Sequence, residues 1–422
     1  GVRLYREDPV FGSGFRGTVR ADFLQKVAIT STVQFGKVSG FRYFYVDAKG
    51  TFNRGIPFGT TGVAFYGFGG GFWWNMQREG STVLASTSSS VAGVNPGETA
   101  SGYRFVPSEG AFGFKAMVTL GTHPSPAGFN ADVALECDLQ NTSGGVTIGR
   151  ISLQGNGYMM AELAARQKAR VTMYADILYD FPRSTLHGVF NVSINASPMT
   201  GGGQAVIHAE PETWYIKVGE PSKRIQVSLA DWLRTNGYLM LGEDLPPPPP
   251  PPLEVTRILG NVSIARDTRI SAGNGFAFGA SLSLSTGRQR YAIFYGEFSA
   301  GGGFDMALMQ QYRCAGINNW YAQGQLYAYV QGSVGLDVSI GFWLYKPCGP
   351  WYCRICRWCQ WRFVGYRGSF EILGISAAAL LEAGGPNPLW VQGNVGGRYS
   401  ILGGLVSGHC SFNFTKGTVC RL

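Results

Sequence analysis

Hydrophobic and polar residues alternate along most of the chain in short runs that end at Gly, Asn or Pro. Such runs include Val27–Val38, Arg42–Ala48 and Phe72–Gln77 in the first half, and Gly275–Ser285 and Tyr321–Val330 in the second. Because successive side chains of a strand point to opposite faces, this alternation predicts β-strands. Short strands at regular spacing predict an all-β fold of antiparallel sheets, arranged as a sandwich or as large curved or barrel-like sheets.

A run of seven prolines, Pro246–Pro252, interrupts this pattern. Proline fixes φ and has no N–H to donate, so the run can enter neither a helix interior nor a central strand. At about 3.1 Å per residue it predicts a stiff spacer of roughly 20 Å. We therefore expect an N-terminal β-rich block at 1–245, a polyproline spacer at 246–252 and a C-terminal β-rich block at 253–422.

Two segments have compositions that also suit helices. Met159–Val171 contains a run of helix-favouring residues but no clear cap, and a strand pattern follows at once, so we expect a strand that leads into a loop. Ile375–Ala383 is rich in Ala and Leu, which suits a helix by composition and equally suits a strand pressed against its neighbour.

Charged residues make up only 14% of the 422 residues, against about a quarter in typical soluble domains. Glycine is abundant and aromatic residues reach 14%, which suits closely packed sheets. The net charge of +9 comes from basic residues that are scattered outside one loop, so we expect no nucleic-acid partner. No apolar run approaches the roughly 18 residues of a transmembrane helix. The chain opens without an initiator Met or a signal peptide, and we expect a processed product or a segment of a longer chain.

Several motifs together resemble one family of proteins. They are Trp320-Tyr321-Ala322-x-Gly324-Gln325-x-Tyr327-Ala328-Tyr329, Pro386-Asn387-Pro388-x-Trp390-x-Gln392-Gly393, Val395-Gly396-Gly397-x-Tyr399, Arg42-Tyr43-Phe44-Tyr45-Val46-Asp47-Ala48 and Gly67-Phe68-Gly69-Gly70-Gly71. The chain resembles segments of very large, secreted, uncharacterised β-rich surface proteins of Bacteroidota. This resemblance implies a secreted or extracellular cell-surface location, and it brings no catalytic residues with it.

The eight cysteines form an even set, which in an exported chain favours disulfides. Cys410 and Cys420 flank a predicted hairpin with its turn near Lys416-Gly417, and a disulfide closing that hairpin is expected. Cys348, Cys353, Cys356 and Cys359 form a cluster that suits nested disulfides, Cys348–Cys359 and Cys353–Cys356, on a protruding hairpin. The alternatives are four thiolate ligands for zinc or an iron–sulfur cluster, or free thiols. Cys137 and Cys314 then pair by elimination.

Aromatic and basic residues surround this cysteine cluster and form a candidate contact loop. They are Trp351, Tyr352, Arg354, Arg357, Trp358, Trp361 and Arg362. Arg and Trp on a protruding hairpin suit contact with a glycan, a lipid headgroup or a neighbouring subunit. The alternative is that the aromatic side chains cover one another while the arginines face water.

The inventory of catalytic residues is poor. The four histidines, His123, His187, His208 and His409, lie far apart in sequence without a metalloenzyme motif, and no nucleophile elbow or catalytic triad motif occurs. A glycosidase pair of carboxylates from distant strands stays open as an alternative. We therefore expect a protein that is not an enzyme and that holds no cofactor, with zinc at the cysteine cluster as the alternative.

These observations favour a structural or adhesive subunit of an extracellular cell-surface assembly, such as a filament, hook or adhesin-like appendage. Its apolar faces would be covered by further copies or by other subunits of the assembly, as in a homo-oligomer. The second hypothesis is a carbohydrate-binding surface module that uses Trp73, Trp74, Trp351 or Trp358 as stacking platforms. The third is an outer-membrane barrel, which the sequence disfavours because its strands show no clean lipid-facing band.

Overall fold

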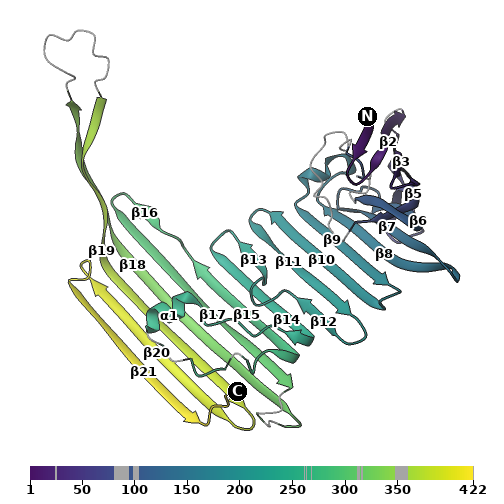
Figure 1. The fold of residues 1–422 in the computed structure, drawn as a ribbon. Helices are drawn as coiled ribbons and strands as arrows, with labels where there is room; N and C mark the ends of the chain where they lie inside the picture. Colours follow the sequence, from purple (N-terminus) through teal and green to yellow (C-terminus); the bar gives the residue numbers. More distant parts are fainter. Residues whose placement is uncertain are drawn as a thin grey trace. The chain divides into compact units, whose positions relative to one another are not determined.

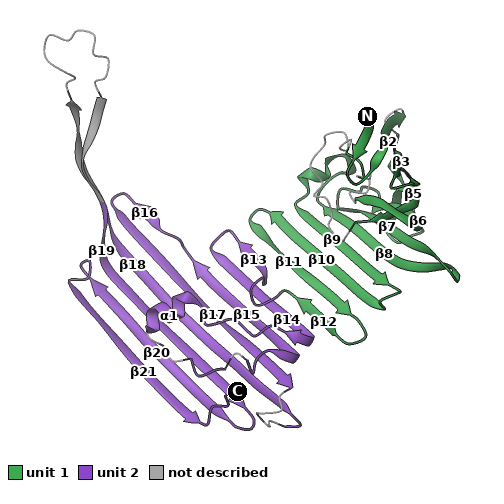
Figure 2. Cartoon of the chain, viewed as in Figure 1, with its two compact units in different colours: residues 1–219 green, residues 220–422 purple. Residues whose placement is uncertain are grey.

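The chain is nearly all β in a computed structural model, as the alternation predicts. The structure describes residues 1–23, 26–79, 95–97, 104–260, 262, 264–267, 269–310, 314, 317–346 and 360–421, without the side chains of 338–346 and 360–367. The described residues form two compact units, unit 1 at Gly1–Gly219 and unit 2 at Glu220–Leu422 (Figure 2).

Unit 1 is an antiparallel meander in which each strand pairs with the next strand along the chain (Figure 1). Its strands are β1 (Val2–Asp8), β2 (Gly12–Phe23), β3 (Val27–Val38), β4 (Phe41–Pro57), β5 (Val63–Arg78), β6 (Phe105–Thr122), β7 (Phe129–Thr142), β8 (Gly145–Met159), β9 (Val171–Asp180), β10 (Thr185–Ala196), β11 (Met199–Ala209) and β12 (Trp214–Val218). A 3₁₀-helix, η1 (Leu163–Lys168), connects β8 to β9 where a loop was expected.

Unit 2 continues the same antiparallel pattern. Its elements are β13 (Ile225–Leu229), β14 (Leu233–Leu245), α1 (Leu253–Leu259), β15 (Gly273–Ser285), β16 (Gln289–Tyr291), β17 (Phe294–Gln310), β18 (Trp320–Lys346), β19 (Gln360–Gly385), β20 (Trp390–Ile401) and β21 (Val406–Gly417). The ambiguous segment Ile375–Ala383 lies inside β19 and is therefore a strand.

The division of the chain at Gly219 and Glu220 differs from the boundary expected at the prolines, which lie inside unit 2. A proline run donates no backbone hydrogen bonds, but its carbonyl oxygens still accept them. The Pro249 carbonyl accepts from Arg266 Nη2 at 2.8 Å and from Gln325 Nε2 at 3.1 Å. The prolines therefore lie against the sheet of unit 2 through contacts that a free spacer does not make.

The segment 246–260, called the strap below, continues from the prolines into α1. Val255 and Ile258 of α1 are buried against Tyr327 of β18 and Leu380 of β19. Arg398 Nε of β20 donates a hydrogen bond of 2.8 Å to the carbonyl oxygen of Ile258. The strap therefore crosses one face of the unit 2 sheet, with α1 packed on β18, β19 and β20 (Figure 1).

Turn and glycine chemistry fix the register of the strands. Ser39 and Gly40 both have positive φ and join β3 to β4 as a two-residue hairpin loop, the geometry that matches strand twist. Gly303 of β17 lies directly opposite Tyr327 of β18. A Cβ at Gly303 would lie 2.6 Å from the Tyr327 hydroxyl oxygen, so glycine is needed there for the tyrosine ring to cross the neighbouring strand.

Candidate functional site

The two faces of the unit 2 sheet have opposite chemistry, and β18 displays it most clearly. From Trp320 to Leu336, alternate residues place Trp, Ala, Gly, Leu, Ala, Val, Gly, Val and Leu on one face. The residues between them, Tyr321 to Asp337, place Tyr, Gln, Gln, Tyr, Tyr, Gln, Ser, Gly and Asp on the other. We call these the apolar face and the polar face. The strap lies on the polar face, because it contacts Tyr327 and Gln325.

The apolar face of unit 2 is exposed across all of its long strands. In β18, Leu326 is 55% exposed, and its cross-strand neighbours Phe304 and Leu381 lie on the same face. The other large side chains exposed on this face include Leu282, Phe298, Met306, Leu308, Val330, Val334, Leu373, Ile375, Val395, Tyr399, Ile401, Phe412 and Phe414. A shallow groove of about 600 Å³ lies on it, lined by residues such as Met306, Leu326 and Leu381.

Unit 1 repeats this division. The large side chains exposed on its apolar face include Val19, Phe23, Ile29, Phe35, Val46, Phe68, Phe72, Trp74, Phe114, Leu135, Leu153, Tyr179 and Val192. Aromatic rings follow one another across the strands: the ring centroids of Phe35 and Phe44 lie 6.1 Å apart, and those of Phe44 and Phe72 lie 5.7 Å apart.

Charged residues are confined to the polar faces over most of the sheet. In the paired stretches of β7 to β11 and of β15, β17, β18 and β20, no described side chain on the apolar face is charged. Where charges occur on this face they lie at strand ends, as with Lys37 of β3, Arg42 of β4 and Lys416 of β21.

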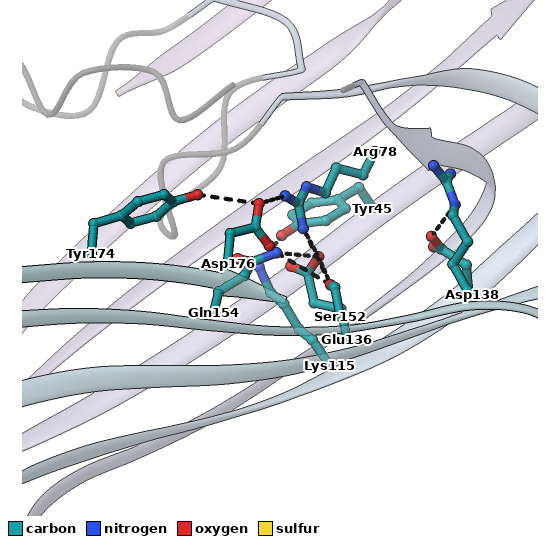
Figure 3. Close-up of polar contacts among 10 residues, drawn as sticks. Tyr45, Arg78, Lys115, Glu136, Asp138, Ser152, Gln154, Tyr174 and Asp176 are labelled. Carbon is teal, nitrogen blue, oxygen red and sulfur yellow. Dashed lines mark hydrogen bonds and ion pairs between the residues drawn. The ribbon is translucent and has the colours of Figure 1, made fainter. Parts of the chain in front are cut away.

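The polar face of unit 1 carries a buried ionic network centred on Arg78 (Figure 3). Arg78 Nη2 donates to Asp176 Oδ2 at 2.6 Å, and Arg78 Nη1 lies 3.5 Å from Glu136 Oε2. Gln154 Nε2 donates to the same Glu136 oxygen at 3.0 Å, and the Tyr174 hydroxyl donates to Asp176 at 3.2 Å. The Arg78 and Glu136 side chains are only 5% and 3% exposed, so both charges are buried. Each of them has an opposite charge beside it, which offsets the cost of removing it from water.

Three further ion pairs lie on this face, on β4, β6, β7 and η1. Lys115 Nζ lies 3.0 Å from Asp47 Oδ2, with both side chains fully buried. Lys49 Nζ lies 2.7 Å from Asp132 Oδ2, which Arg166 Nη1 also contacts at 2.6 Å. Asp132 is therefore held between two cations.

Asp138 of β7 lies on the same face beside Arg150 of β8, whose Nε is 3.3 Å from Asp138 Oδ2.

The polar face of unit 2 holds its own charged groups beneath and beside the strap. Arg224 Nη2 donates to Asp305 Oδ1 at 2.6 Å. The Ala265 N–H donates to Glu382 Oε2 at 3.1 Å, and Arg266 Nε lies 3.9 Å from Glu382 Oε1. A polar cavity of about 880 Å³ on this face is lined by Glu297, Gln331, Glu371, Arg398 and His409, among others.

Most residues of the predicted contact loop lie outside the described residues. These are Trp351, Tyr352, Arg354, Arg357 and Trp358, together with Cys348, Cys353, Cys356 and Cys359. Trp361 and Arg362 begin β19, and their backbone pairs with Tyr345 and Leu344 of β18. The nested disulfides, the thiolate metal site and the contact loop thus stay predictions.

The predicted cysteine pairs are wrong where the structure describes them. Cys420 forms a disulfide with Cys314, not with Cys410, which is a free and exposed thiol. The chain turns between β20 and β21, at 402–405, so Cys410 lies in the middle of β21 opposite Gly397. Cys420 lies beyond the end of that strand and packs with Ile270 and Tyr321. Cys137 is also a free thiol, so its expected pairing with Cys314 is wrong as well.

The stacking platforms expected for a glycan lie in different environments. Trp73 is fully buried on the polar face, with its ring 4.8 Å from Phe105 and 6.3 Å from Tyr45 between centroids, so the expectation of exposure is wrong for it. Trp74 is 42% exposed, but it lies among the aromatic residues of the apolar face.

Two histidines that are remote in sequence meet on the polar face of unit 1. His187 of β10 and His208 of β11 lie directly opposite each other, with their Nδ1 atoms 3.3 Å apart. Sequence reasoning missed this pair because it depends on the register of the β10–β11 hairpin. The alternation of both strands, combined with a turn at Ser197-Pro198, is the pattern from which it follows.

No relative of this chain is found, and its described residues lack two features. Comparison with protein-family models, with curated proteins and with solved structures finds no match to this chain. Among the described residues, no group of three or more His, Cys, Asp or Glu side chains is arranged to hold a metal ion. In the same part of the chain, no helix is long and apolar enough to cross a membrane.

Proposed function

We propose that this chain is a membrane-embedded protein of the outer-membrane type, whose strands turn the apolar face to lipid and the polar face to water. The observation that carries this proposal is the exposed apolar face, which continues from strand to strand in each unit and is free of charge in the described central parts of the strands. Monomeric soluble proteins rarely expose an apolar patch of more than a few hundred Å². Lipid acyl chains cover such a face without requiring any specific partner surface.

Strand length supports the same proposal. A strand needs about 9–11 residues to cross the hydrocarbon core of a bilayer when it is tilted by about 45°. β10 has 12 residues, β15 has 13 and β17 has 17, so each is long enough. Alternation of apolar and polar residues over such lengths is the sequence pattern of membrane-spanning strands.

Backbone hydrogen bonding gives the proposal a further requirement. No water is available in the hydrocarbon core, so each strand there must be paired along both edges. Strands inside each meander, such as β7 and β18, meet this requirement through their two neighbours. An edge strand such as β21 then needs a partner strand from elsewhere in the assembly.

The structural-subunit hypothesis stays a prediction that uses the same apolar face in another way. In that case other protein surfaces, and not lipid, cover the face. The lipid alternative is favoured because no described side chain of this face in β15, β17, β18 and β20 is charged, so the face offers no ion pair to set the register of a protein partner. Specific interfaces carry about one hydrogen bond per 100–200 Å².

The test is to fold the full chain with and without phospholipid vesicles. We expect it to float with the vesicles in a density gradient, to stay with them at pH 11 and to aggregate when no lipid or detergent is present. Monodisperse, soluble monomers without detergent would overturn the proposal. Regular rings or filaments in detergent-free electron micrographs would overturn it in favour of the structural subunit.

A further inference from the structure

The histidine pair of unit 1 has the geometry of a chelating site. His187 and His208 are opposed residues of the hairpin formed by β10 and β11, and both side chains lie on the polar face. Their rings are nearly perpendicular, with an interplanar angle of 70° and centroids 5.4 Å apart. The two Nδ1 atoms approach to 3.3 Å, so one ring nitrogen from each residue lies within reach of a single metal ion.

We propose that His187 and His208 form a metal site that binds Zn²⁺ through their two Nδ1 atoms. Zinc–nitrogen bonds of about 2.0–2.1 Å at a tetrahedral angle place two ligand nitrogens about 3.3–3.4 Å apart. The observed separation of 3.3 Å matches this value. Square-planar coordination with bonds of the same length requires about 2.8–3.0 Å, so the geometry favours zinc over copper(II).

Residues beside the pair orient one of the two rings. Glu210 Oε1 lies 3.8 Å from Nε2 of His208, on the side of the ring away from His187. A carboxylate at the far nitrogen of a histidine favours the tautomer that leaves the near nitrogen free to bind metal. Tyr215 of β12 stacks on the His208 ring, with centroids 5.0 Å apart and an angle of 30°. The ring is thus held between a carboxylate and an aromatic face.

Without metal, one of the two Nδ1 atoms donates its proton to the other in a long hydrogen bond. Binding of Zn²⁺ through both Nδ1 atoms moves that proton to Nε2 of the same ring, so two neutral imidazoles bind the metal with no net release of protons. The two protein ligands leave two tetrahedral positions for water or for a ligand from outside. The site therefore clips β10 to β11, and it is independent of whether lipid covers the apolar face.

The experiment is a calorimetric titration of the folded full chain with Zn²⁺ alone. The free thiols are first blocked with N-ethylmaleimide, so that the cysteines cannot bind the metal. We expect one site per chain, and an affinity at least 10-fold weaker in His187→Asn and in His208→Asn. His409→Asn is the matched control, since His409 lies on the polar face of unit 2, and its affinity is expected to equal that of the wild type.

Two results would overturn the proposal. One is the absence of any binding to the wild-type chain at 1 mM Zn²⁺, which needs no variant and does not depend on how the variants fold. The other is an affinity that is unchanged in both His→Asn variants. Glu210→Gln removes the charge of the carboxylate beside His208. We expect it to weaken Zn²⁺ binding by about 10-fold, which is the lower end of the loss caused by replacing a partner of a metal-binding histidine. Failure of the chain to enter lipid vesicles would leave these results unaffected.

Discussion

An arginine substitution on the apolar face distinguishes a face that is covered by lipid from one that is covered by water. Leu326 lies near the middle of the apolar run of β18 and is 55% exposed, so Leu326→Arg meets little steric resistance. In water, a substitution at such an exposed position changes the free energy of unfolding by about 0.5 kcal/mol or less. On a lipid-facing strand at the bilayer midplane, arginine costs about 2–4 kcal/mol. The expected change in the free energy of unfolding is thus several-fold larger on a lipid-covered face than on a water-covered one.

The cost should also depend on position along the strand. The apolar run extends from Trp320 to Leu336, with its centre at Ala328. Val330 lies near this centre, and the four residues from Val330 to Val334 span about 13 Å along the strand. Arginine at Leu326 or Val330 should therefore cost about 2–4 kcal/mol, and arginine at Val334 should cost about 0–1 kcal/mol, the value near the membrane interface. A protein partner that covers the face gives no reason for a symmetric decline from the centre.

The free energy of unfolding is measured by urea titration of the chain folded into vesicles, followed by tryptophan fluorescence. Leu405→Arg is the matched control, because Leu405 is 80% exposed in the turn between β20 and β21 and lies outside the strands. Its substitution should cost less than about 0.5 kcal/mol. Equal small effects at Leu326, Val330 and Leu405 would refute the assignment of this face to lipid.

Two further predictions concern the polar face and the disulfide. Arg78→Met should cost about 3–5 kcal/mol, because it leaves buried carboxylates without their cation. Arg183→Met, at a side chain that is 81% exposed, should cost under about 0.5 kcal/mol, and urea titration of both variants checks the difference. Cys314→Ser opens a link across 106 residues and should cost about 2–5 kcal/mol, while Cys410→Ser should have no effect under the same non-reducing conditions.

The sequence alone predicts the strands well but not the division of chemistry between the two faces. The alternation that predicted strands is the same one that separates Leu326 from Gln325 and Val330 from Gln331. Glycines such as Gly324 and Gly332 occupy apolar-face positions and weaken the contrast. A bulge beside Val334 also shifts the register of β18 against β19. For these reasons the band became recognisable only once the strand pairing was known.

The errors concern features that depend on distant parts of the chain. The Cys410–Cys420 prediction assumed a turn at Lys416-Gly417, but the chain turns earlier, where Gly403 and Gly404 both have positive φ. The short helix α1 has no side-chain cap and is held by packing on β18 and β19, so no local pattern announces it. The local residue pattern is therefore enough to predict the strands. The contacts between side chains of different strands can be predicted only when the register of the sheet is known.

The low charge of the chain follows from this arrangement. In a two-layer fold, the apolar faces of two sheets cover each other and the charged faces meet water. Each unit here is a single layer, and it keeps its charges on the face that already carries ion pairs such as Lys115–Asp47 and Arg224–Asp305. The strap covers part of that polar face and no part of the apolar one. The apolar face of each unit is exposed over its described residues. Under the proposed function a bilayer covers this face, and such a cover needs neither charge nor hydrogen bonds from the protein.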